Sequence, residues 1–219
     1  MKKYFSIALM CTMVILLFAC QTAKYDTIIK NGMVYDGNGG TPYKADIGIK
    51  NDTIAFIGDL QNESAKNIVD AKGMAVSPGF INMLSWAPVS LIIDGNSQSD
   101  IRQGVTLEVF GEGESMGPLN PKMKQEMQAN QGSYKFDVAW NTLGEYMNYM
   151  EKKGIATNIA SYVGATTIRT NVIGEDDRAP TAAELKKMQD LVRTEMKAGR
   201  PQKQAVAIAM SKAGMSRNV

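Results

Sequence analysis

Carboxylates are the side chains of this sequence that could hold a catalytic metal ion. The chain of 219 residues contains no histidine, and both cysteines, Cys11 and Cys20, fall in the N-terminal segment. A catalytic zinc site takes three protein ligands, usually including histidine or cysteine, whereas carboxylates favour hard ions such as Mg²⁺ or Mn²⁺. The candidate ligands are Asp94, Glu108, Glu112 and Glu114.

Glu112 is the best placed of these carboxylates. It follows the predicted strand 105–110, and barrel enzymes carry their catalytic groups in the loops after their strands. The alternative is that all four are solvated charges without a catalytic role. Ser85 lacks a base to activate it as a nucleophile, because no histidine is present. Ser99 and Asp100 are interpreted as helix-capping residues, with Ser97 or Ser99 as the N-cap of the helix 97–103.

Residues 24–74 are predicted to form a small β domain. Four segments are rich in β-branched side chains or alternate with period two, namely 25–30, 45–50, 53–57 and 67–71. Asn31-Gly32 predicts a two-residue hairpin turn, because both positions tolerate positive φ. Asn51-Asp52 predicts a second turn. A β domain of about 50 residues is marginal in isolation.

Residues 75–199 change to strands that alternate with helices, a pattern typical of an α/β domain with a parallel sheet. Strands are predicted at 80–84, 105–110 and 155–163, and helices at 97–103, 121–128, 142–153 and 181–198. Within the helix 142–153, an apolar face predicts packing against a sheet; it carries Leu143, Tyr146, Met147 and Met150. A closed (β/α)8 barrel needs eight strand–helix units and about 250 residues. The pattern here therefore predicts an incomplete barrel of about three units, and we expect no complete active site in this chain alone.

Residues 1–20 resemble the signal peptide of a bacterial lipoprotein. Two lysines precede the apolar run 5–18, which is too short to span a bilayer but suits a signal peptide. Leu17-Phe18-Ala19-Cys20 resembles a lipobox, which implies lipidation of Cys20 and a membrane as partner. The chain is therefore expected on the periplasmic or outer-membrane side of a bacterial envelope. The alternative is an ordinary cleaved signal peptide with an incidental cysteine.

Residues 200–219 are rich in alanine, basic and without an acidic residue, and they predict one short helix at 202–212. We interpret them as the product of a truncated or spliced reading frame, with a natural short variant as the alternative. The net charge of +2 gives no reason to expect nucleic acid as a partner.

Three segments resemble the amidohydrolase superfamily, and within it the N-acyl-D-amino-acid deacylases. Ser77-Pro-Gly-Phe-Ile-Asn82 is similar to the family's "(A/S)PGFID" entry into the first barrel strand. The segment 104–115 resembles "GVTT(V)VxGNCGxS", and 163–169 resembles "VGHGTLR". The resemblance covers about residues 25–199 and ends there.

The resemblance implies a β-sandwich beside a metal-dependent barrel, and a zinc-activated water that cleaves a non-peptide amide C–N bond of a small N-acylated amino acid. The family's metal-ligand positions fall on Leu84, Trp86, Gly113 and Ala165, none of which has a ligand side chain. Two hypotheses follow. One is a hydrolase scaffold that is truncated and inactive as this chain, and the other is a non-catalytic, lipid-anchored binding protein that reuses the fold.

Overall fold

A computed structural model describes residues 23–198, which divide into two compact units between Pro78 and Gly79. The predicted signal peptide with its lipidated Cys20, and the predicted helix at 202–212, lie outside the described residues. Among the helices that the structure describes, none combines the length and the apolar character needed to cross a membrane.

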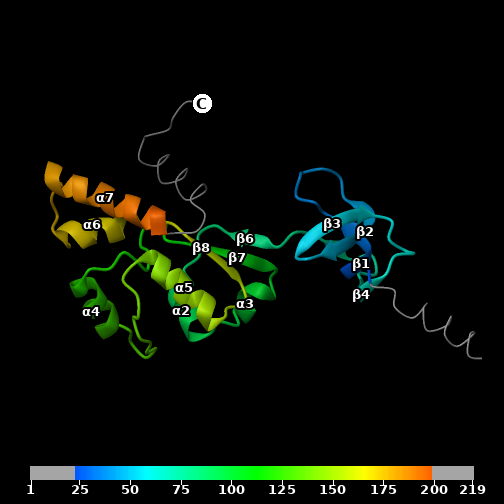
Figure 1. Cartoon of the computed structure of the whole chain (residues 1–219), viewed down its shortest axis with the longest axis horizontal. Coiled ribbons are helices and arrows are strands. Elements are labelled where there is room, and N and C mark those ends of the chain that lie inside the picture. Colours follow the sequence, from blue (N-terminus) through cyan, green and yellow to red (C-terminus); the bar gives the residue numbers. More distant parts are fainter. Residues whose placement is uncertain (1–22, 199–219) are drawn as a thin grey trace, which may run out of the picture. The chain divides into compact units, whose positions relative to one another are not determined.

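The first unit contains one five-stranded sheet (Figure 1). Its strands are β1 (Tyr25–Val34), β2 (Tyr43–Lys50), β3 (Thr53–Gly58), β4 (Ala65–Asp70) and β5 (Ala75–Val76). β1, β2 and β3 pair antiparallel, whereas β4 and β5 both pair parallel with β1. The predicted β domain is confirmed, although its described residues form a single sheet and β4 crosses over instead of continuing a meander.

The hairpin predicted at Asn31-Gly32 is wrong, because β1 runs through both residues. The pairing of β1 with β2 shifts register between Ile29 and Gly32, so Asn31, with φ of 58°, lies in a β-bulge. The Asn31 N–H donates to Asp46 Oδ1 at 2.8 Å, and a Cβ on Gly32 would lie 2.8 Å from Val76 Cγ2. Tertiary contacts thus decide how this Asn-Gly pair is used. The turn predicted at Asn51-Asp52 is present, with positive φ at both residues.

The second unit contains a parallel sheet in the order β6-β7-β8 (Figure 1). Its strands are β6 (Phe80–Asn82), β7 (Val105–Phe110) and β8 (Asn158–Ser161). Its helices are α2 (Pro88–Ile93), α3 (Gln98–Ile101), α4 (Pro121–Ala129), α5 (Leu143–Lys153), α6 (Ala165–Ile173) and α7 (Ala182–Ala198). The predicted α/β class is confirmed, and the described residues form no closed barrel.

Two boundaries and two helices differ from the predictions. The strand expected over 80–84 ends at Asn82, because Met83 and Leu84 form a turn. The strand expected over 155–163 is limited to β8. Helices α2 and α6 were not predicted, since α2 has only six residues and α6 starts after Gly164 without a side-chain cap.

An aromatic cluster centred on Trp140 forms the core of the second unit. Trp140 packs against Phe136, Tyr146 and Tyr149, and its Nε1 donates to the carbonyl oxygen of Met116 at 2.6 Å. The predicted apolar face of α5 is confirmed, because Leu143, Tyr146 and Met150 are buried in this cluster and Met147 packs against it. The Tyr146 hydroxyl donates to the Pro88 carbonyl at 3.1 Å, which joins α5 to the start of α2.

Glu195 joins α7 to the first turn of α5. Its buried carboxylate accepts a hydrogen bond from the Leu143 N–H at 2.8 Å. Burial raises the pKa of Glu195 above its ordinary value of 4.5, hydrogen bonding to Leu143 opposes this rise, and the neighbouring charge of Glu145 adds to it. In contrast, backbone hydrogen bonds from Asn141 and Thr142 lower the pKa of Glu145.

The opposite pKa shifts of Glu195 and Glu145 predict that their contributions to stability change with pH in opposite directions. The folded chain holds the Glu195 proton more tightly than the unfolded chain does. The contribution of Glu195 to the free energy of unfolding is therefore greatest below pH 4.5 and declines as the pH rises through the raised pKa. Glu195→Gln should abolish that decline in urea-unfolding curves recorded at several pH values. Glu145→Gln should instead remove stability that is present above pH 4.5 and lost as the pH falls. Equal pH profiles for parent and Glu195→Gln would contradict this assignment.

Candidate functional site at the carboxyl edge of the parallel sheet

The segments that follow the three parallel strands meet at one edge of the sheet. They are residues 83–86 after β6, 111–115 after β7 and 162–164 after β8. Because the strands are parallel, their carboxyl ends lie at the same edge, and α/β folds bind their ligands there. This edge is therefore the candidate functional site.

Hydrogen bonds fasten the segment after β7 to the segment after β8. The Ser115 N–H donates to Thr167 Oγ1 at 2.8 Å, and the Gly164 N–H donates to Ser115 Oγ at 2.9 Å. The Thr166 N–H donates to the Gly113 carbonyl oxygen at 2.9 Å. The loop after β7 therefore supplies acceptors for the N–H groups of Gly164 and Thr166 at the start of α6. These bonds fix the loop after β7 against the segment after β8.

Two glycines allow this close approach. A Cβ on Gly164 would lie 2.5 Å from the Gly113 carbonyl oxygen and 2.7 Å from the Ser115 nitrogen. Gly111 has φ of 81°, and a Cβ there would collide with the Tyr162 carbonyl oxygen. Both loops consequently depend on residues without side chains at these positions.

The positions that the resemblance assigns to metal ligands present no donor side chain. Leu84 and Trp86 follow β6 and are 51% and 84% exposed. Gly113 lies in the loop after β7 and Ala165 begins α6, and both are exposed. Hydrocarbon and indole groups do not ligate zinc, so these four residues do not fit the metal that the fold family implies. What they offer instead is an apolar and aromatic surface on the β6 side of the edge.

The four candidate carboxylates do not converge. Glu112 and Glu114 lie exposed in the loop after β7, at the carboxyl edge. Asp94 lies toward the opposite, amino edge, because the Gly95 carbonyl accepts from the N–H of Ala156, just before β8. Within residues 23–198, no group of three or more histidine, cysteine, aspartate or glutamate side chains could hold a metal ion.

The serines and Asp94 have local roles. Ser85 is buried, and its Oγ accepts from the Ala87 N–H at 3.2 Å. Ser97, one of the two predicted N-cap residues, occupies the N-cap position of α3, although its side chain makes no cap bond. The hydroxyls of Ser97 and Ser99 instead donate to Asp100 Oδ2, at 2.9 and 2.8 Å. Asp94 Oδ1 accepts from the Asn96 N–H at 3.0 Å and closes a turn. None of these contacts forms a nucleophile–base pair.

Glu108 is the unusual carboxylate of this unit. It is fully buried in the central strand β7, and its Oε2 accepts from Asn82 Nδ2 at 3.2 Å. Its Oε1 has no hydrogen-bond partner within the part of the chain that the structure describes. A buried polar atom without a partner carries a desolvation cost of about 1–3 kcal/mol. A glutamate inside the apolar run Val105-Thr-Leu-Glu-Val-Phe110 was the sequence signal for this position.

Replacing Glu108 with leucine is expected to raise the free energy of unfolding by about 1–3 kcal/mol, because the unpaired carboxylate oxygen disappears. The substitution also removes the acceptor of Asn82 Nδ2, but Asn82 is only partly buried, so water can satisfy its amide. Urea unfolding of the full chain measures the change. Glu114→Leu serves as the control, since Glu114 is exposed and its replacement should have an effect within about 0.5 kcal/mol. Destabilisation by Glu108→Leu alone would instead mean that a cation or a donor from outside residues 23–198 satisfies Oε1.

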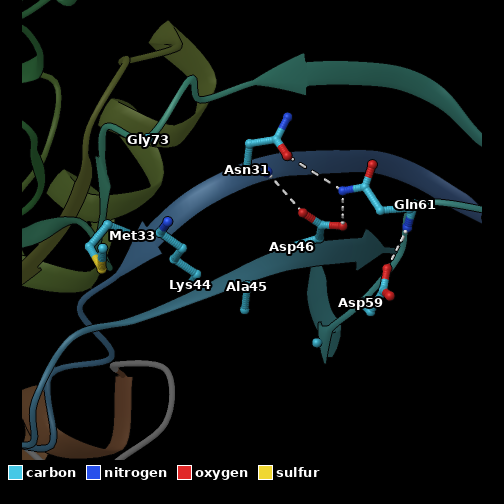
Figure 2. A pocket seen from close by; sticks show the side chains of 9 residues that line it. Asn31, Met33, Lys44, Ala45, Asp46, Asp59, Gln61 and Gly73 are labelled. Carbon is cyan, nitrogen blue, oxygen red and sulfur yellow. Dashed lines mark hydrogen bonds between the residues drawn. The ribbon is translucent and has the colours of Figure 1, made fainter.

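A second concave feature lies in the first unit, where no site was expected from the sequence. It is a cavity of about 510 Å³ lined by Asn31, Met33, Lys44, Ala45, Asp46, Gly58, Asp59, Gln61 and Gly73 (Figure 2). Buried Asp46 accepts hydrogen bonds from the Asn31 N–H, the Leu60 N–H and Gln61 Nε2, at 2.8, 3.0 and 3.0 Å. These internal bonds give Asp46 a structural role, namely to hold the β1 bulge against the segment after β3.

Comparison with known proteins shows which families this chain is similar to. Residues 12–80 match the model of the urease alpha-subunit N-terminal domain. The D-aminoacylase of Alcaligenes xylosoxydans xylosoxydans is 33% identical over 179 residues, which cover 80% of this chain and 36% of that protein. The chain thus spans little more than a third of the length of this relative.

Solved structures agree with the sequence match. A crystal structure of D-aminoacylase superposes with a TM-score of 0.68 at 32% identity, over 80% of this chain and 37% of that one. The zinc and phosphonate complex of N-acyl-D-glutamate deacylase from Bordetella bronchiseptica superposes with a TM-score of 0.69 at 26% identity, over 80% and 36%. The resemblance expected from the three motifs is therefore confirmed.

Proposed function

We propose, on the premise that this chain is D-aminoacylase-like and belongs to the amidohydrolase superfamily through the N-terminal portion of its relatives, that it binds a small N-acylated amino acid without hydrolysing it. Two of the relatives are named N-acyl-D-aspartate deacylase and N-acyl-D-glutamate deacylase, so their names give N-acylated D-amino acids as substrates. The observation that carries the proposal is the apolar pair Leu84 and Trp86 at the carboxyl edge, where the family resemblance places metal ligands.

The chemistry of the exposed pair suits an acyl group. An indole ring offers a large apolar face and one N–H donor, so it can cover a hydrocarbon chain while the donor meets a polar atom. Burial of each methylene contributes about 0.8 kcal/mol, or roughly a fourfold change in affinity. The proposal includes anchoring of the chain to a bacterial envelope membrane through Cys20, which the lipobox supports.

Fluorescence titration of the full chain with N-acetyl-D-leucine and N-octanoyl-D-leucine tests the binding. The chain contains two tryptophans, of which Trp86 is exposed and Trp140 is fully buried. We expect a saturable change in emission that is lost in Trp86→Phe. The affinity that it reports should be higher for the octanoyl compound than for the acetyl compound. Acetate release from the acetyl compound should stay at background with Zn²⁺, Mn²⁺ or Mg²⁺. Absence of a saturable change would contradict the binding proposal.

Metal-assisted hydrolysis of an amide C–N bond is the second candidate. The observation that favours it is the position of Glu112 and Glu114 in the loop after β7, at the edge where barrel enzymes carry catalytic groups. This candidate predicts acetate release that a chelator abolishes and that Glu112→Gln lowers. In the same assay, Asp94→Asn is the control, because Asp94 lies toward the opposite edge.

A further inference from the structure

We propose that Asn38, in the loop between β1 and β2, is a modification site at which spontaneous deamidation converts asparagine to aspartate and isoaspartate. The sequence contains two Asn-Gly pairs, Asn31-Gly32 and Asn38-Gly39. A glycine after asparagine favours this reaction, because it places no side chain beside the backbone nitrogen that attacks. The structure distinguishes the two pairs, since it fixes the first within β1 and leaves the second in an open loop.

The reaction consumes only water. The backbone nitrogen of Gly39 attacks Cγ of Asn38, the bond from Cγ to Nδ2 breaks, and the amide nitrogen leaves as ammonia with the Gly39 amide proton. Water then opens the resulting succinimide ring at either of its carbonyl carbons. One opening gives aspartate, and the other gives isoaspartate, in which the main chain runs through Cβ and Cγ. Either product adds a negative charge to the loop and lowers the formal net charge by one from +2.

The surroundings of Asn38 permit the attack. Asn38 and Gly39 are both exposed. The Asn38 N–H donates to Asp36 Oδ1 at 3.0 Å, whereas the Asn38 side chain makes no hydrogen bond within residues 23–198. Gly39 has φ of 77°, and a Cβ added there would meet no atom within 4 Å. The Asn38 side chain and the Gly39 nitrogen can therefore approach each other without breaking a contact of the fold.

Asn31, in contrast, is held by its neighbours. Its N–H donates to Asp46 Oδ1 at 2.8 Å (Figure 2), and its carbonyl oxygen accepts from the Gly73 N–H at 2.8 Å. Its Nδ2 donates to Asp70 Oδ1 at 2.9 Å. Gly32 is buried and pairs with β2. Attack by the Gly32 nitrogen requires rotations that break these bonds, so β1 must open locally before Asn31 can react.

Peptide mapping of the full chain after incubation at mildly alkaline pH, below its unfolding temperature, tests the proposal. Trypsin cuts after Lys30 and Lys44, so both pairs lie in the peptide 31–44 and are measured in one fragmentation spectrum. We expect Asn38 to convert at least about ten-fold faster than Asn31, because Asn31 must first lose its hydrogen bonds. Electron-transfer fragmentation should identify isoaspartate beside aspartate at position 38.

The same incubation in guanidinium chloride is the control, since unfolding removes the contacts that distinguish the two pairs. There the two rates should agree within about two-fold. Asn38→Gln is the matched variant, because its longer side chain would have to form a less favourable six-membered ring. It should abolish conversion at position 38 and leave the rate at Asn31 unchanged.

Three results overturn the proposal. One is conversion of Asn31 as fast as that of Asn38 in the folded chain. Another is a folded chain that stays unmodified at Asn38 while the unfolded chain reacts. The third is aspartate without isoaspartate at position 38, which would indicate direct hydrolysis of the side chain instead of ring formation.

Discussion

Replacing Trp140 with alanine is expected to lower the free energy of unfolding by about 3–5 kcal/mol. Trp140 is fully buried, and its ring contacts Phe136, Tyr146 and Tyr149. The substitution removes these contacts, leaves a cavity, and takes away the donor that satisfies the Met116 carbonyl. Urea unfolding followed by far-ultraviolet circular dichroism measures the loss.

Trp86→Ala is the matched control for this prediction. Trp86 is 84% exposed, so the same chemical change there should alter the free energy of unfolding by no more than about 0.5 kcal/mol. A comparable loss from both substitutions would show that Trp86 is covered in solution. A small loss from Trp140→Ala would show that the aromatic cluster does not organise the second unit.

Gly111→Ala is expected to cost about 2–4 kcal/mol of stability and to disturb the candidate site. With φ of 81°, Gly111 lies in the left-handed region, where a Cβ costs about 1–2 kcal/mol. The added methyl would also lie 2.7 Å from Ser161 Oγ and closer still to the Tyr162 carbonyl, and overpacking of this kind costs about 1–3 kcal/mol. Thermal or urea unfolding of the full chain measures the effect.

The same loop offers the control for Gly111→Ala. Gly113 has open space where a Cβ would be added, and its φ is not positive. Gly113→Ala should therefore change stability by no more than about 0.5 kcal/mol. If both alanine variants unfold alike, the contact between the loop after β7 and the segment after β8 is looser than the hydrogen bonds of Ser115 indicate.

Elements with a strong local signal were predicted accurately. The apolar run Val105–Phe110 is β7 residue for residue, and the helix expected at 142–153 is α5 with a capping box between Thr142 and Glu145. Both signals act over a few neighbouring residues, so no distant contact is needed to produce them. The long helix expected at 181–198 likewise corresponds to α7.

Predictions that depended on distant neighbours were less successful. Asn31-Gly32 has the composition of a hairpin turn, but Asp46 and Val76 hold it in a bulge within β1. Asp94 was grouped with Glu112 as a possible ligand, yet hydrogen bonding near the start of β8 places it at the other edge of the sheet. Spacing along the chain carries no information on which edge a loop reaches.

The amino-acid sequence by itself determined which donor atoms exist. A chain without histidine, with leucine and tryptophan after its first parallel strand, lacks imidazole ligands whatever its conformation. Only the tertiary structure decided that Glu112 and Glu114 share an edge without Asp94. It also decided that, among residues 23–198, one oxygen of buried Glu108 has no partner and β6 pairs with β7 alone. The physical reason is that composition belongs to single residues, whereas burial and strand pairing arise from contacts between segments far apart in the chain.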